Sequence, residues 1–192
     1  LTSYVHLSSR SSFPNPLLMK ELKQQVFRHI FATSGVIESI QSYNDDLKNF
    51  FTERVTLHFS LHTTELRNFL MPINITHPYS KTIQILNDTY KISGEKPCIG
   101  ILLFKNFIPN EKDFSFTTTY ELVENMLRQL NPRTCRLSFC EFNKSPEIGK
   151  SDAFPRETAM QIIELAKSQG FEAKLFTSFG HEKQTACGML GA

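Results

Sequence analysis

The feature that most constrains the fold is a strand-then-helix unit that recurs along the chain roughly every 40 residues. Strands are predicted over residues 26–33, 54–62, 98–104, 134–143 and 171–179. Between them, apolar residues recur at helical spacing. Parallel strands need crossover connections of a dozen or more residues, which helices supply. The pattern therefore predicts an α/β fold with a parallel sheet, either a segment of a barrel or an open doubly wound sheet.

Capping residues predict where the helices begin and end. Ser80 is expected to cap a helix that ends near Gly94, and Thr118 with Glu121 is expected to form a capping box before the next helix. A later helix is expected to begin near Pro155. Its C-cap would be Gly170, and its buried face would carry Ala159, Ile162, Ile163 and Ala166.

Composition narrows the function classes. The 192 residues contain 21 Lys+Arg and 19 Asp+Glu, so the net charge is +2. Because the chain as a whole is not strongly basic, any affinity for RNA must come from a limited part of its surface. No segment approaches the roughly 20 apolar residues of a membrane span, and no signal peptide is evident. The four cysteines form no Cys-x-x-Cys pair, so we expect reduced thiols in a cytoplasmic protein without a structural zinc site. A first residue other than Met suggests a truncated or processed start.

The strand over 55–62 carries candidate functional residues. Thr56, His58, Ser60 and His62 alternate strictly with apolar residues, so one face of the strand is polar. In an α/β fold the functional groups gather at the C-terminal ends of the strands, where Ser60 and His62 lie. Two interpretations remain open at this point: a strand with one solvated face, or a binding site.

Two further residues are also either structural or functional. Asn143 closes the strand over 134–143, where it is either a turn former or a functional residue. Cys187 lies in an aperiodic tail between Ala186 and Gly188, which leave its thiol accessible. It is either an inert packed side chain or a nucleophile.

Several short motifs occur together in one order along the chain. They are Ser34-Gly35-Val36, Ser60-Leu61-His62, Leu66-Arg67-Asn68, Met71-Pro72-Ile73-Asn74, Phe142-Asn143 and Ala186-Cys187-Gly188. From about residue 31 to the C-terminus, this combination resembles the radical S-adenosylmethionine methyltransferases that modify adenosine in ribosomal and transfer RNA, the RlmN/Cfr family. The chain matches the C-terminal portion of such proteins.

The resemblance implies the later part of a partial (β/α) barrel, with S-adenosylmethionine across the strand ends. It implies that Ser34, Ser60, His62 and Asn143 contact this cosubstrate, and that Cys187 accepts a methyl group from one S-adenosylmethionine. In the family, a second molecule is then cleaved to a radical that activates the methyl, which adds to adenine at carbon-2 or, more rarely, carbon-8. RNA is the implied partner, with no membrane and no specified oligomeric state.

We therefore expect the chain to form a single domain over residues 1–192. It comprises a divergent N-terminal remnant over 1–33, barrel units over 34–180, and a tail over 181–192 that carries Cys187.

The chain departs from the family at the iron–sulfur cluster. Family members hold a 4Fe-4S cluster through Cys-x-x-x-Cys-x-x-Cys, and these 192 residues contain no such run and supply no metal ligands. Two functions therefore stay open: part of an active RNA methyltransferase, or a non-catalytic or truncated relative that retains binding of S-adenosylmethionine or RNA. The complete reading frame distinguishes them, because only the enzyme would carry the three cysteines upstream.

Overall fold

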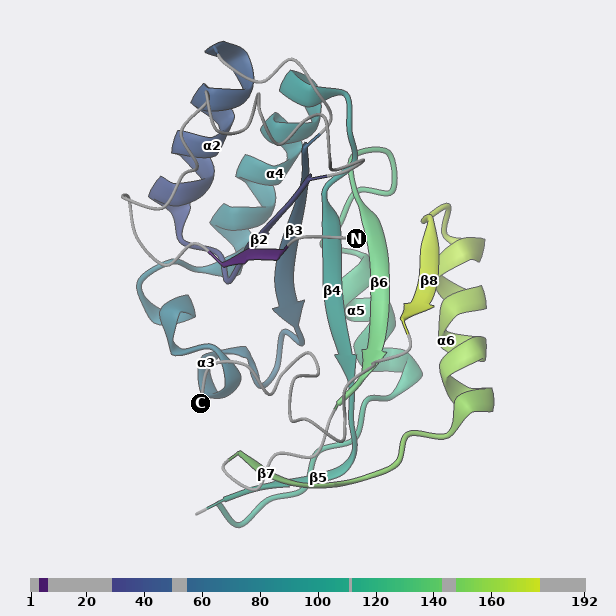
Figure 1. Ribbon diagram of the computed structural model, residues 1–192. Coiled ribbons are helices and arrows are strands. Elements are labelled where there is room, and N and C mark those ends of the chain that lie inside the picture. The colour runs from purple at the N-terminus through teal and green to yellow at the C-terminus, as the bar shows by residue number, and fades with distance from the viewer. Residues whose placement is uncertain (1–3, 7–28, 50–54, 111, 143–147, 177–192) are drawn as a thin grey trace. The chain divides into compact units, whose positions relative to one another are not determined.

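Helices alternate with parallel strands in the computed structural model of the chain, as the sequence pattern predicts (Figure 1). The structure describes residues 4–6, 29–49, 55–110, 112–142 and 148–176. The backbone divides into two compact units, Leu1–Ile99 with Leu130–Arg136 and Gly100–Gln129 with Leu137–Ala192. The predicted α/β fold class is confirmed.

In the described part of the first unit, the strands β1, β2 and β3 are parallel neighbours in that order. Their bounds are Tyr4–His6 for β1, His29–Thr33 for β2 and Val55–His62 for β3. The strand β1 was not predicted from the sequence. The pairing of β2 with β3 runs from His29 opposite Val55 to Thr33 opposite Phe59. Consequently, both strands end at the same edge.

Helices of the first unit cover β2 and β3 and fill the connection after β3 (Figure 1). They are α2 (Ile37–Asn49), α3 (Arg67–Leu70), the 3₁₀ helix η1 (Pro72–Ile75) and α4 (Tyr79–Ser93). Tyr43 of α2 stacks on Phe31 of β2 with ring centroids 5.0 Å apart. Thr89 of α4 donates a buried hydrogen bond of 2.8 Å to Asn44 of α2. Aromatic packing therefore joins α2 to the sheet, and a buried polar contact joins α2 to α4.

One cap predicted for α4 is correct and the other is wrong. Gly94 adopts the left-handed conformation, with φ of 68°, and its N–H donates to the carbonyl of Tyr90. Ser80 is not the N-cap, because the helix begins at Tyr79 with Pro78 at that position. Proline fixes its own φ and pre-sets the chain for the first turn, so the helix begins before the serine.

The strands β4, β6 and β8 are neighbours in that order, and the second unit contains β4 from Gly100, β6 from Leu137 and all of β8. Their bounds are Cys98–Leu103, Arg136–Glu141 and Ala173–Phe176. The pairing of β6 with β8 is parallel. Two shorter strands, β5 (Lys105–Pro109) and β7 (Gly149–Asp152), form an antiparallel ribbon that was not predicted. Both strands are short, and neither has the apolar pattern that identified the other strands.

The helices of this unit are α5 (Tyr120–Leu127) and α6 (Arg156–Ser168). The N-cap of α5 is Thr119, whose hydroxyl accepts from the N–H of Leu122 at 3.3 Å. Thr118 is instead buried, and its hydroxyl accepts from the N–H of Phe104. The capping box predicted at Thr118 is therefore wrong by one residue, because a tertiary contact takes that hydroxyl.

The predicted apolar face of α6 is confirmed. The helix begins directly after Pro155, and four predicted residues are buried: Ala159, Ile162, Ile163 and Ala166. Gln169 occupies the C-cap position, and Gly170 follows it with φ of 87°. None of the helices that the structure describes has the length and apolar character needed to cross a membrane.

Candidate functional site at the ends of two parallel strands

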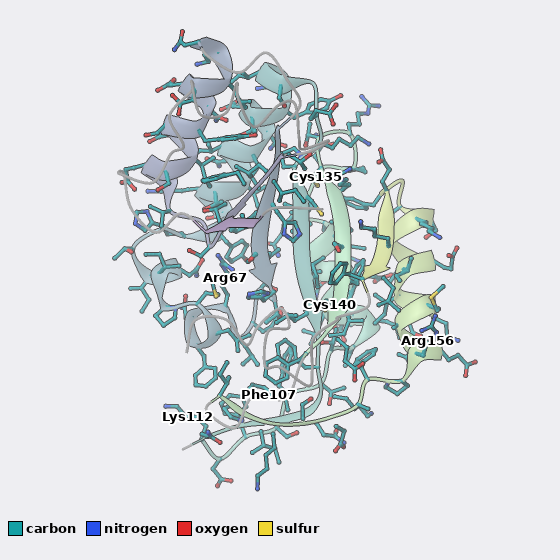
Figure 2. The ribbon with its side chains drawn as sticks, viewed as in Figure 1. Arg67, Phe107, Lys112, Cys135, Cys140 and Arg156 are labelled. Atoms are coloured by element: carbon teal, nitrogen blue, oxygen red, sulfur yellow. The ribbon has the colours of Figure 1, made fainter. Side chains whose placement is uncertain are left out.

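A buried arginine joins the C-terminal ends of β2 and β3 (Figure 2). Arg67, the first residue of α3, has no exposed surface. Its Nη1 donates to the carbonyls of Ser60 at 2.6 Å and Leu61 at 2.7 Å, and its Nη2 donates to the carbonyl of Ser34 at 2.6 Å. We call this group, Arg67 with the carbonyls of Ser34, Ser60 and Leu61, the arginine clamp.

The segment after α3 orients the guanidinium group. Nε of Arg67 donates to Oδ1 of Asn74 at 3.0 Å, and the same oxygen accepts from the N–H of Tyr79 at 2.8 Å. Nδ2 of Asn74 donates to Asn68 at 2.6 Å. The guanidinium also lies over the ring of Phe59, 4.8 Å from its centroid. Contacts to neutral oxygens and to one ring therefore fix the arginine in place.

Glycine is required where the chain leaves β2. Gly35 has φ of +109°, and a Cβ there would lie 2.8 Å from Cε2 of Phe59 and 3.3 Å from Nη2 of Arg67. The N–H of Gly35 donates to Oγ1 of Thr33 at 3.1 Å, and its carbonyl accepts from Thr82 at 3.3 Å. Only a residue without a side chain fits between the arginine clamp and α4.

The chain leaves β3 through a strained turn centred on His62. This residue has φ of 65°, and the N–H of Thr63 donates to the carbonyl of Leu61 at 2.9 Å. A three-residue hydrogen-bonded turn with positive φ is rare and strained, at a cost of about 1–3 kcal/mol. Such strain persists where the surroundings hold it, and here the arginine clamp holds the carbonyl of Leu61.

The imidazole of His62 has a polar atom to offer a ligand. The side chain is half-buried, and its Nδ1 is buried with no hydrogen-bond partner among the described residues. Burial, then the charge of Arg67, then His58 lower the pKa of His62 to about 3. The ring is therefore neutral at physiological pH and can accept or donate a hydrogen bond without carrying charge.

The structure places three of the predicted cosubstrate residues at one strand edge. Ser34 follows β2, and Ser60 and His62 end β3. One guanidinium binds the carbonyls of both serines, so their backbones lie close together. Asn143 and Cys187 lie outside the described residues. Arg67 was not among the site residues predicted from the sequence, although it occurs in one of the motifs that carried the family resemblance.

The strand edge fits a polar cosubstrate better than a metal cluster. An unpartnered buried nitrogen, half-buried serines and a glycine that brings the backbone close are typical of a small-molecule site. No group of three His, Cys, Asp or Glu side chains suited to a metal occurs among the described residues. Cys98, Cys135 and Cys140 are buried, and burial raises the pKa of Cys135 to about 12. These three thiols do not fit a 4Fe-4S cluster.

The fold matches a solved structure of a methyltransferase. It aligns with TM-score 0.67 to a radical SAM methyltransferase from Sphaerobacter thermophilus, at 21% identity over 83% of this chain and 43% of that one. No family model matches the sequence. The strands and helices therefore share the fold of the matching part of that structure.

Comparison with curated protein sequences finds relatives with more specific names. The "Probable dual-specificity RNA methyltransferase RlmN" of Malacoplasma penetrans is 25% identical over 83% of this chain and 41% of its own length. The ribosomal RNA large subunit methyltransferase Cfr of Shouchella clausii is 24% identical over 99% of this chain and 55% of its own length. This chain is thus a relative of the RlmN and Cfr proteins, which confirms the resemblance found from its motifs. It spans about half the length of these relatives.

Proposed function

We propose that the chain is the cosubstrate-binding part of an enzyme that methylates adenine in RNA with S-adenosylmethionine. The observation that carries this proposal is the arginine clamp together with Asn74, in which four motifs of the family resemblance form one connected structure at a strand edge. Relatives named as RNA methyltransferases support the choice of RNA as substrate. The proposed target is carbon-2 of adenine in ribosomal RNA. The alternatives are transfer RNA as the substrate and carbon-8 as the methylated atom.

Within this function, Ser34, Ser60, His62 and Asn143 bind S-adenosylmethionine. The two serines supply short hydroxyl groups, and Nδ1 of His62 supplies a buried polar atom without a partner among the described residues. Calorimetric titration of the chain with S-adenosylmethionine tests the assignment. His62→Ala and Ser60→Ala should each weaken binding by about tenfold, the equivalent of one charge-neutral hydrogen bond lost from a dry site. Wild-type affinity in both variants would contradict it.

Cys187 is the proposed methyl acceptor. Its thiolate would attack the methyl carbon of S-adenosylmethionine, forming an S–CH₃ bond as the bond from carbon to the sulfonium breaks and S-adenosylhomocysteine leaves. Mass spectrometry of the complete, active protein should find one extra methyl on the peptide that contains Cys187 and on no other cysteine peptide. Cys187→Ala should abolish adenine methylation, scored as methyladenosine in digested RNA. Full activity of this variant would exclude the cysteine as the acceptor.

The second candidate function is binding of S-adenosylmethionine or RNA without catalysis, by a non-catalytic or truncated relative of these enzymes. The cysteine spacing of the chain is what suggests it, because the family's three cluster ligands are not among these residues. Digestion of RNA treated with the protein encoded by the complete reading frame distinguishes the two functions. Appearance of 2-methyladenosine or 8-methyladenosine supports the enzyme, and binding of S-adenosylmethionine without either product supports the second function.

A further inference from the structure

The arginine clamp begins where the pairing of β2 with β3 ends. Thr33 lies opposite Phe59 in the last pair, and the same offset places Ser34 opposite Ser60. At this edge the outgoing carbonyls have no further ladder to join and need other donors. Arg67 donates to both of them at 2.6 Å. One side chain therefore extends the junction of the two strands by one residue, at the two serines assigned to the cosubstrate.

Three peptide planes become fixed in this way. A peptide group is planar, so holding a carbonyl also sets the direction of the following N–H. The carbonyls of Ser34, Ser60 and Leu61 fix the planes that lead into Gly35, Leu61 and His62. The strained turn at His62 therefore begins on a peptide group that Arg67 holds.

Stability alone does not account for a charged residue in this place. Among the described residues no carboxylate forms an ion pair with Arg67, and its hydrogen bonds go to neutral oxygens. Burial lowers the pKa of Arg67 to about 10, which shows how much solvation the charge has lost. An apolar side chain of similar volume would avoid that cost. What only an arginine supplies is a planar fork that reaches oxygens on two strands at once.

We propose that Arg67 is a positioning residue for S-adenosylmethionine: by holding the carbonyls of Ser34, Ser60 and Leu61, it sets the two serines and His62 in the arrangement that receives the cosubstrate. Arg67 does not touch the cosubstrate, because its side chain has no exposed surface. The inference rests on the proposed function of the same strand edge. It predicts that the geometry of the fork matters as well as the positive charge.

The first test compares two variants of the 192-residue chain. Arg67→Lys keeps a charge but loses the fork, whereas Thr89→Val removes a buried hydrogen bond between α4 and α2, away from the strand ends. Both should lower the melting temperature. Calorimetric titration with S-adenosylmethionine, well below both melting temperatures, should show binding weakened about tenfold or more in Arg67→Lys and unchanged in Thr89→Val. Equal affinities in the two variants would overturn the proposal.

The second test does not depend on cosubstrate binding. Amide hydrogen exchange of the unliganded chain should accelerate about tenfold or more at Gly35 and Thr63 in Arg67→Lys, with the amides of α2 and α4 unchanged. Unchanged exchange at both positions would overturn the proposal. A wild-type chain that binds no S-adenosylmethionine would instead contradict the proposed function, and the exchange result would then decide the role of Arg67 alone.

A third variant covers the case in which Arg67→Lys does not fold. Asn74→Ala keeps Arg67 and removes the oxygen that orients its Nε, together with the contacts of Asn74 to Tyr79 and Asn68. It should weaken binding of S-adenosylmethionine and accelerate exchange at Gly35 and Thr63 in the same direction, by a smaller factor. Wild-type values for both measurements in this variant would count against the positioning role.

Discussion

The two units of the chain close the carboxyl ends of their parallel strands by opposite means. In the first unit a buried charge, Arg67, binds the carbonyls that β2 and β3 leave behind. In the second unit, Phe104 follows β4 and Phe142 follows β6, and their rings stack with centroids 4.9 Å apart. Phe107 of β5 packs against both rings at 5.1 and 5.0 Å. We call the rings of Phe104, Phe107 and Phe142 the aromatic cluster.

The difference agrees with the roles proposed for the two edges, stability for the aromatic cluster and binding for the arginine clamp. The aromatic cluster removes apolar area from water, which is the main source of folding free energy, and its interior offers no polar group to a ligand. The arginine clamp carries a desolvation cost and keeps serine, histidine and backbone groups in a fixed arrangement. Truncating a ring therefore costs mainly stability, whereas breaking a directed hydrogen bond of the clamp also changes the local geometry.

The largest expected effect is on the aromatic cluster. Phe104→Ala should lower the free energy of unfolding by about 3–5 kcal/mol, because Phe104 is fully buried and the truncation leaves a cavity among rings. Urea denaturation followed by circular dichroism measures the loss. Phe114→Ala is the control, since Phe114 is 40% exposed and its truncation should cost about 0.5 kcal/mol or less. Similar losses in both variants would show that the cluster does not stabilise the fold.

The next effect separates strain from crowding at the arginine clamp. Gly35→Ala should destabilise the chain by about 1–3 kcal/mol, because the added Cβ meets Phe59 and Arg67 at a backbone conformation that alanine resists. Gly94→Ala is the matched control. Gly94 also has positive φ, but a Cβ there would have nothing within 4 Å. Thermal denaturation should show the larger loss for Gly35→Ala, and equal losses would mean that the clamp tolerates the extra methyl group.

The smallest effect, at mildly acidic pH, is a dependence of stability on pH that comes from His62. Its pKa falls from 6.5 to about 3 on folding, so below pH 6.5 the unfolded chain binds the proton more readily. The stability of the folded chain is therefore highest above about pH 6.5 and falls progressively as the pH is lowered toward 3. At about pH 5.5 the loss should be about 1 kcal/mol relative to pH 7.

His62→Gln isolates that contribution, because glutamine is polar but does not titrate. The difference in unfolding free energy between wild type and His62→Gln should change with pH between about 6.5 and 3 and stay constant above this range. Denaturant titrations at a series of pH values measure the difference. Parallel profiles for the two proteins would show that the pKa of His62 is not lowered on folding. They would also contradict a neutral His62 imidazole in the proposed site.

Much of the fold could be predicted from periodicity because burial decides it locally. The apolar run of β4 and the i, i+3, i+4, i+7 face of α6 each report a buried surface directly. Prediction was wrong at Ser80 and Thr118, where hydroxyl residues resemble caps but the chain uses a proline or a tertiary partner instead. The ribbon of β5 with β7 was missed because its partners are separated by about 40 residues of chain that carry no matching pattern.

The sequence by itself determined the α/β class, the strand edge at which Ser60 and His62 lie, and the kinship with RlmN and Cfr. These follow from periodicity and from short motifs, which are properties of neighbouring residues. Only the tertiary structure decided that Arg67 lies at the centre of that edge. The bond from Arg67 to Ser34 joins residues 33 positions apart, and the burial that turns an arginine into a clamp arises when β2, β3, η1 and α4 pack around it. Such a role depends on distance in space, which no local pattern encodes.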